Sequence, residues 1–161
     1  VATGALDLAV VTDAPPGLAA DMRLSRHRLG FDAMRVVVPI GHPATATSIT
    51  GLEAFADEIW VEDNEGSAAL LRAAATRAGF EPRIELTAAD LAGKTALVAA
   101  GHAVALVPGL LLPALRADVV AVPLPDGPKR GIYATLPAEP QHPPTPAAAL
   151  LARLHAAFDE M

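Results

Sequence analysis

A chain of 161 residues, of which 52% are apolar and only 4% aromatic, is long enough to fold as one ordinary domain or two small lobes around a core of alanine, valine and leucine. Twelve basic and eighteen acidic residues give a formal net charge of −6, and no stretch gathers lysine and arginine into a surface for a phosphate backbone, so the chain alone is not expected to bind DNA. The chain has no cysteine, which excludes disulfides, thiolate nucleophiles and zinc-thiolate sites and suits a cytoplasmic location.

The N-terminal quarter of the chain is predicted to form three strands. Residues 6–11 are almost continuously apolar, which is typical of a strand that is buried on both faces inside a parallel sheet. Two more strands are expected at residues 22–29 and 34–40, separated by a turn at residues 30–32. The third strand ends at Gly41-His42-Pro43, where we expect the chain to cross between lobes.

Between residues 50 and 107 the pattern alternates strands with helices. Thr50 and Glu53 form a capping-box pattern, which predicts a short helix to about residue 57. Ser67 is expected to cap a longer helix, and Gly79 to end it at the C′ position. Strands are expected at residues 59–62, 83–86 and 103–107, and a further helix from residue 87. This alternation favours a mostly parallel sheet with helices on its faces.

The C-terminal third is predicted to return through two more strands. A helix at residues 110–115, strands at 119–124 and 130–136, and a final helix at 145–158 are expected, with a proline-rich surface connection at 137–146. The longest apolar run, residues 104–115, is interrupted by two prolines and a glycine and falls short of the roughly 20 residues that a membrane helix needs. No membrane span is expected.

Two polar segments are candidates for ligand binding. In the turn at residues 63–67, Gly66 permits close approach and Ser67 offers a hydroxyl, while the free amides of the following helix favour an anionic ligand. An ordinary helix cap explains the same residues equally well. Thr12 and Asp13 are the second candidates, because ligands of open parallel α/β sheets bind beyond the carboxyl ends of the strands.

Motifs for catalysis and metal binding are weak. Gly93-Lys94-Thr95 resembles only the end of a phosphate-binding loop and lies inside an expected helix. Residues 62–65 carry several oxygen ligands but do not follow the spacing of a calcium-binding EF-hand. None of the three serines lies in a Gly-x-Ser-x-Gly motif, and His42 is expected to be a turn histidine rather than a general base. No enzyme activity, cofactor or metal site is predicted.

Four segments together resemble the effector-binding domain of LysR-type bacterial transcription regulators: residues 4–11, 35–43, 78–82 and 98–108. The likeness runs from Gly4 nearly to the C-terminus. It implies an α/β fold like that of type 2 periplasmic binding proteins, in which two α/β lobes are joined by two crossing strands and a small-molecule effector binds in the cleft between them. Residues 1–37 and 120–161 would then form lobe I, and residues 38–119 lobe II.

The resemblance also implies which residues contact the effector. Family members place contacts at the end of the first-lobe strand, in the helix-start turn of lobe II, and in the loop before the later lobe II strand. The corresponding positions are Thr12, Asn64, Gly66, Ser67, Gly101 and His102. From the residues alone, His102 is as much a structural histidine as a cleft residue. Ala103 stands where the family usually has glycine, which puts a close ligand approach there in doubt.

Two parts of such regulators are not expected within the chain. These are the N-terminal winged helix-turn-helix, through which the protein would bind DNA, and the opening β-α-β-α part of lobe I, so lobe I is expected to be incomplete. In the family, the segments that match residues 67–78 and 83–86 pack against a neighbouring subunit, which implies a homodimer or homotetramer. We therefore expect a cytoplasmic regulatory domain that senses a small anionic metabolite. The alternatives are a solute-binding protein of a transport system and an enzyme on the same scaffold.

Overall fold

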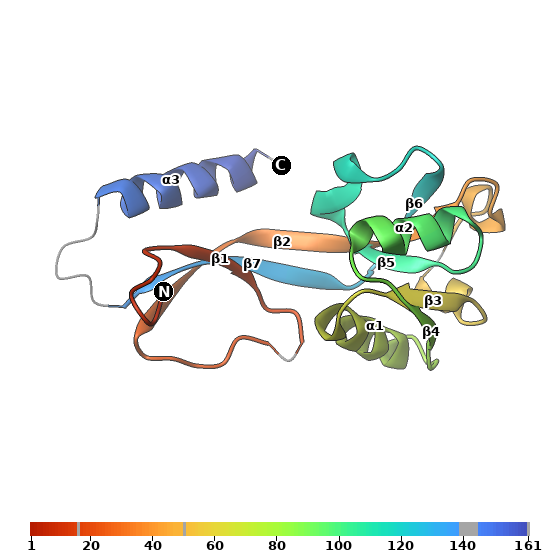
Figure 1. Cartoon of the computed structure of the whole chain (residues 1–161), viewed down its shortest axis with the longest axis horizontal. Coiled ribbons are helices and arrows are strands. Elements are labelled where there is room, and N and C mark those ends of the chain that lie inside the picture. Colours follow the sequence, from red (N-terminus) through yellow and green to blue (C-terminus); the bar gives the residue numbers. More distant parts are fainter. Residues whose placement is uncertain (16, 50, 139–144, 161) are drawn as a thin grey trace. The chain divides into compact units, whose positions relative to one another are not determined.

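The computed structural model describes residues 1–15, 17–49, 51–138 and 145–160. The chain divides into two compact units. Unit 1 consists of Val1–Phe31 and Arg130–Met161, and unit 2 of Asp32–Lys129. Two strands run from one unit into the other, β2 (Leu24–Pro39) and β7 (Lys129–Pro137) (Figure 1). The predicted pair of crossing strands is therefore present.

The limits of these units differ from those of the predicted lobes. We expected boundaries near residues 37 and 119, whereas the structure divides the chain after Phe31 and after Lys129. That the two units act as the halves of a hinged effector cleft stays a prediction.

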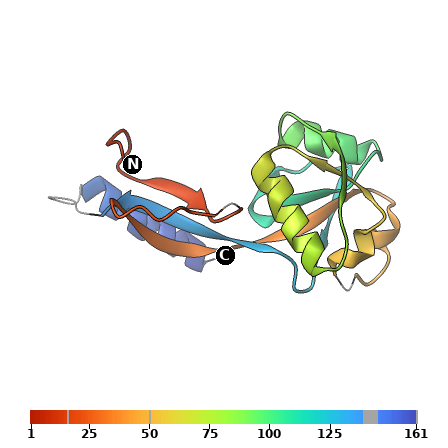
Figure 2. The same ribbon diagram turned by 90° about the horizontal axis from the view of Figure 1, so that it is seen from below.

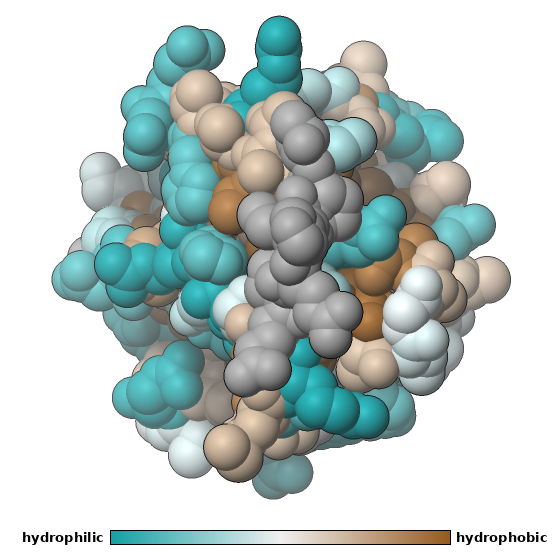
Figure 3. Space-filling model, turned by 90° about the vertical axis from the view of Figure 1, so that its left-hand side faces the viewer, coloured by the Kyte–Doolittle hydropathy of each residue, from teal (hydrophilic) through white to brown (hydrophobic). Residues whose placement is uncertain are grey.

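Unit 1 is a sheet in which β7 lies between β1 (Ala9–Thr12) and β2. Helix α3 (Thr145–Asp159) covers one face of this sheet (Figure 1). The side chains at this contact are aliphatic, apart from Phe158: Leu29, Ile132 and Ala134 from the strands, and Leu151, Leu154 and Phe158 from α3. The cover is partial, because Val10 remains 51% exposed and Phe31 59%. Hydrophobic patches are visible on the face of the molecule that Figure 3 shows.

The prediction that residues 6–11 form a strand buried on both faces of a parallel sheet is wrong. Strand β1 is four residues long, pairs antiparallel with β7, and is the last strand on its side of the sheet. Apolar composition reports a tendency to be buried, but it does not say which strand will be the neighbour. An edge strand with one partner leaves part of its apolar surface exposed.

The two strands expected at residues 22–29 and 34–40 are one strand, β2, of 16 residues. The expected turn at residues 30–32 does not form, and Gly30 is part of the extended strand. A Cβ atom at Gly30 would lie 3.0 Å from a ring carbon of Phe158 in α3. Glycine at this position therefore permits close packing of the helix against the strand and does not mark a turn.

The strands of unit 2 lie in the order β6-β2-β5-β3-β4, and β3 and β4 form a two-stranded sheet of their own beside β5. Strands β5 (Ala105–Pro108) and β6 (Val119–Pro123) pair antiparallel with the second half of β2. Strands β3 (Ile59–Glu62) and β4 (Arg83–Thr87) pair parallel, and a parallel bridge from Trp60 to Val104 joins them to β5. The expected parallel arrangement is confirmed for β4, β3 and β5 and does not extend to β2 and β6.

Helices cover both faces of the sheet in unit 2. Helix α1 (Glu65–Arg77) lies on one face and α2 (Leu91–Ala99) on the other (Figure 1). Figure 2, seen from below, has α1 in front of the sheet. Trp60 and Val61 are consecutive in β3 and are both fully buried, because alternate side chains of a strand enter the two cores on opposite faces.

Two of the helices expected in unit 2 are short 3-10 helices. Residues Leu52–Phe55 form η2 and residues Gly109–Ala114 form η3, and a further one, η1, spans Pro43–Thr45. The capping box predicted from Thr50 lies outside the described residues. Gly79 ends α1 as expected, with a positive φ of 86° that favours glycine.

Candidate functional site

The carboxyl ends of the three parallel strands lie along one edge of the sheet in unit 2. These ends are Glu62 in β3, Thr87 in β4 and Pro108 in β5. The antiparallel register pairs Pro108 with Met34, near the point where β2 enters unit 2. Ligands of open α/β sheets bind beyond the carboxyl ends of strands, so this edge is where a site is expected.

The turn that was predicted to bind a ligand lies at this edge, immediately after β3. Helix α1 begins at Glu65 and is capped by Asn64, whose Oδ1 accepts a hydrogen bond from the Ser67 N–H at 2.9 Å. The prediction that Ser67 is the cap is therefore wrong, and Ser67 lies in the first turn. Its hydroxyl donates to the carboxylates of Glu62 and Asp63, the second at 3.1 Å. The protein's own side chains therefore already bind the hydroxyl and the N–H of Ser67.

A buried ion pair connects this turn to helix α2. The ammonium group of Lys94, in α2, donates to Glu62 Oε2 at 2.5 Å and to Asp63 Oδ1 at 3.3 Å. The side chain of Lys94 is 2% exposed and that of Glu62 4%. A charge withdrawn from water needs a partner of opposite charge with hydrogen bonds, and each of these residues supplies it for the other. The pair ties the end of β3 to α2.

Burial raises the pKa of the Glu62 carboxyl above its ordinary value. The charge and hydrogen bond of Lys94 and the hydrogen bond from Ser67 act in the opposite direction, while the charge of Asp63 adds to the rise. The second carboxylate oxygen, Oε1, is buried and has no hydrogen-bond partner among the described residues. Burial of the ionised Glu62 carboxylate therefore costs free energy that its hydrogen bonds and the charge of Lys94 offset only in part.

Neither Glu62 nor Lys94 was predicted as a site residue. Gly93-Lys94-Thr95 lies within α2, as expected, and the two carboxylates bind the ammonium group, so the segment is no phosphate loop. The sequence does contain a signal: Lys94 falls three residues after Leu91 and four before Val98, on the helix face that enters the core. A lysine at such a position requires a buried carboxylate elsewhere in the chain.

Gly101 and His102 lie at the opposite ends of the parallel strands, which are their amino ends. They follow α2 and precede β5, beside the amino ends of β3 and β4, where a pocket of about 260 Å³ is lined by Ile59 and Arg83 as well. Gly101 has a positive φ of 76°, and the N–H groups of Gly101 and His102 donate to Val98 and Leu97 at 2.8 and 3.1 Å. This Schellman motif ends α2. The structure does not bring these residues together with Asn64, Gly66 and Ser67.

Thr12 and Asp13 belong to unit 1, at the carboxyl end of β1. Thr12 pairs with Ile132 in β7. The carboxylate of Asp13 accepts the Gly131 N–H at 2.6 Å and the Tyr133 hydroxyl at 3.2 Å. Asp13 thus fastens the end of β1 to β7, which is a structural role that the sequence pattern did not indicate.

Within the described residues, no group of three or more histidine, cysteine, aspartate or glutamate side chains is arranged to hold a metal ion. None of the helices in the same part of the chain is long and apolar enough to cross a membrane.

Comparison with solved structures shows the same fold in bacterial regulators. The regulatory domain of Synechocystis PCC6803 CcmR, in complex with 2-PG, is 18% identical with a TM-score of 0.78 over 99% of this chain and 76% of that one. The BenM effector-binding domain, with its effector benzoate, is 21% identical with a TM-score of 0.80 over 98% and 72%. A Corynebacterium glutamicum OxyR variant is 22% identical with a TM-score of 0.80 over 98% and 50%.

The chain thus spans between half and about three quarters of the length of these three proteins. No curated protein matches it significantly. A model of the LysR substrate binding domain matches residues 1–159. The chain therefore belongs to the LysR substrate-binding domain family, whose members have the α/β fold of type 2 periplasmic binding proteins.

Proposed function

We propose that this chain is the effector-sensing part of a LysR-type transcription regulator, and that the effector contacts the turn at residues 63–67 of unit 2. The observation that carries the function is the match of the family model over residues 1–159. The position of the turn at the carboxyl ends of the parallel strands supports the choice of site. DNA binding would belong to a part of the regulator outside this chain.

The charges around the turn restrict the chemistry of the effector there. Glu62, Asp63 and Glu65 carry three carboxylates, while Lys94 supplies one ammonium group. An acidic group placed against this turn would be repelled, although the effector-binding domains of BenM and QuiR, which have a similar fold, bind the carboxylates benzoate and shikimate. The effector therefore presents a hydroxyl or ammonium group to the turn, and an anionic effector binds its acidic group elsewhere.

Binding acts by shifting the population of states and requires no chemical reaction. An effector that binds one arrangement of subunits more tightly than another moves the equilibrium by that difference in affinity. A homodimer or homotetramer in the cytoplasm would pass this shift to the DNA-binding parts. Residues Gly101 and His102 lie too far from the turn, at the other edge of the sheet, to share this contact.

A thermal-shift screen of the full-length protein tests the site. Small hydroxy acids, amino acids and plain carboxylates are compared, and a ligand present at 100 times its Kd should stabilise the fold by about 2.7 kcal/mol. The variants Asn64→Ala and Ser67→Ala should reduce that stabilisation by at least half. Ser25→Ala, at a serine of β2 outside the turn, is the matched control. A ligand whose effect survives both turn variants would remove this turn from the site.

A further inference from the structure

Unit 2 has a second pocket, beside β6, which lies across the sheet from β3 and the turn. It is a pocket of about 580 Å³ along β6, a strand that pairs with β2 alone within the described residues. The segment that contains η1 and residues 45–49 forms the facing wall. Strands β2 and β5 separate β6 from β3, so about three strand spacings, roughly 14 Å, lie between this pocket and the Glu62 turn.

Among the described residues that line the pocket, Arg35 is the one cation and none is acidic. Arg35, in β2, makes a single long hydrogen bond, to the carbonyl oxygen of Met34 at 3.4 Å, and no carboxylate pairs with it within the described ranges. The hydroxyl of Ser48 makes no hydrogen bond in that same part of the chain. Thr45 and Thr47 donate to the carbonyl oxygens of His42 and Pro43, at 2.7 and 2.8 Å. The side-chain donors left for a ligand are Arg35 and Ser48.

The rest of the lining is apolar and well supported. Arg35 pairs with Pro123, and Ala121 lies on the same face of the sheet. Val122 and Leu124 alternate with them in the chain, are 5% and 6% exposed, and belong to the main core of unit 2. A cavity of this volume, with an apolar floor and a few polar groups, is typical of sites for small molecules. Pro123 lies in β6 and has no N–H to donate, so the strand is poorly suited to pair with a peptide.

We propose that this pocket binds a small monocarboxylate with an aliphatic or aromatic body. The planar guanidinium group of Arg35 matches a carboxylate with two parallel hydrogen bonds, and Ser48 adds a third donor. The apolar body lies against Ala121 and Pro123, which line the pocket on the same face of the sheet as Arg35. This site goes beyond the proposed effector site, because it uses none of the residues of the turn and lies wholly within unit 2.

Methyl NMR of the full-length protein tests the proposal, with hexanoate as the probe and hexanamide as its neutral counterpart. Hexanoate should shift the methyl signal of Ala121, and hexanamide should bind at least tenfold more weakly. Arg35→Gln should weaken hexanoate binding about tenfold or more and leave hexanamide unchanged. Arg35→Lys keeps the positive charge but loses the planar guanidinium group that donates two parallel hydrogen bonds. This variant should weaken hexanoate binding by a smaller factor.

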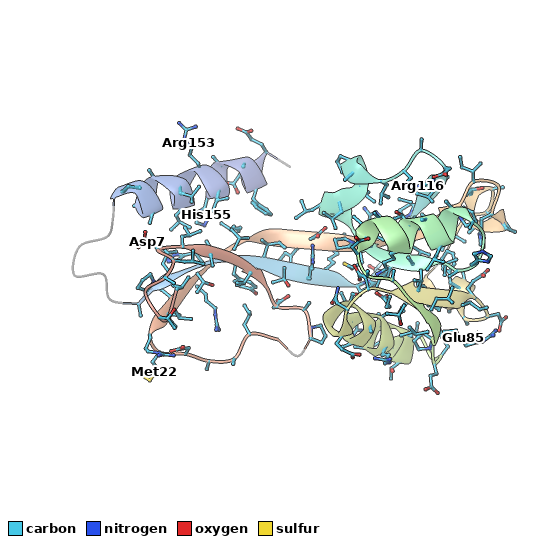
Figure 4. All side chains as sticks on the ribbon, in the orientation of Figure 1. Asp7, Met22, Glu85, Arg116, Arg153 and His155 are labelled. Carbon is cyan, nitrogen blue, oxygen red and sulfur yellow. The ribbon has the colours of Figure 1, made fainter. Side chains whose placement is uncertain are left out.

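Arg153→Gln is the matched control. It removes the same charge from an exposed position on α3, where the side chain projects away from the strands (Figure 4). If Arg35→Gln lowers stability, Arg35→Lys and Ser48→Ala decide the matter under conditions in which both are folded. Equal binding of the two probes, or equal binding to the wild type and the Arg35 variants, would overturn the proposal. Shifts confined to Leu86 and Leu91, near the turn, would place hexanoate outside this pocket and would overturn the proposal.

Discussion

The turn after β3 and the pocket along β6 handle charge in opposite ways. At the turn, Lys94 and Glu62 are almost fully buried and satisfy each other. In the pocket, Arg35 is only partly buried and has no acidic partner among the described residues. A paired buried charge acts on the fold, because its removal leaves its partner uncompensated, whereas an unpaired charge at a surface pocket is available to a ligand. Four predictions test this contrast, from the largest expected effect to the smallest.

Replacing Lys94 should cost more stability than any other single change at the turn. Lys94→Met keeps the volume of the side chain but leaves Glu62 buried without its counter-charge, so the free energy of unfolding should fall by about 3–5 kcal/mol in urea titrations. The double variant with Glu62→Gln should recover most of that loss. A loss below about 1 kcal/mol for Lys94→Met would show that the pair is exposed to water in solution.

The raised pKa of Glu62 makes stability depend on pH. Between the ordinary value of 4.5 and the raised folded value, the folded protein binds more protons than the unfolded chain. The contribution of Glu62 to stability is therefore complete below this interval and is lost as the pH rises through it, at up to about 1.4 kcal/mol per pH unit. Urea unfolding at several pH values should show this slope in the wild type and not in Glu62→Gln. Identical slopes in the two proteins would contradict a raised pKa.

Removing the cap of α1 should have a moderate effect. Asn64→Ala eliminates the hydrogen bond to the Ser67 N–H and should lower the free energy of unfolding by about 1 kcal/mol. Asn64→Asp retains an acceptor and should recover stability in part. If Asn64→Ala proves neutral while Ser67→Ala costs about as much as a lost cap, the cap would be Ser67, as the sequence suggested.

Arg35→Gln should change the free energy of unfolding least, by less than about 0.5 kcal/mol. The reason is that Arg35 makes only one long hydrogen bond and no ion pair with the described residues. Unfolding in urea, compared with that of Arg153→Gln, measures the difference. A loss of several kcal/mol would show that Arg35 stabilises the fold, as Lys94 does, and would contradict the view that its charge is available to a ligand.

Much of unit 2 could be predicted from local pattern. Strands β3 and β4 are confirmed nearly to the residue, and Gly79 is confirmed as the end of α1, although α1 begins at Glu65 and not after Ser67. In the candidate site, the turn at residues 63–67 could be predicted as a binding element, because a glycine and a serine at the start of an amphipathic helix are a local signal; that prediction remains to be tested. Its connection to Lys94 was not, because 32 positions separate Lys94 from Glu62.

The sequence by itself determined which segments are strands and helices in most of the chain and, through the family resemblance, the α/β fold class. It could do so because alternation, capping residues and glycine at helix ends report local backbone conformation and burial. The tertiary structure alone decided that residues 24–39 are one strand, that β1 lies at an edge, and that Lys94 has a carboxylate partner while Arg35 has none among the described residues. These outcomes depend on which distant residues become neighbours, and local patterns carry no information on that.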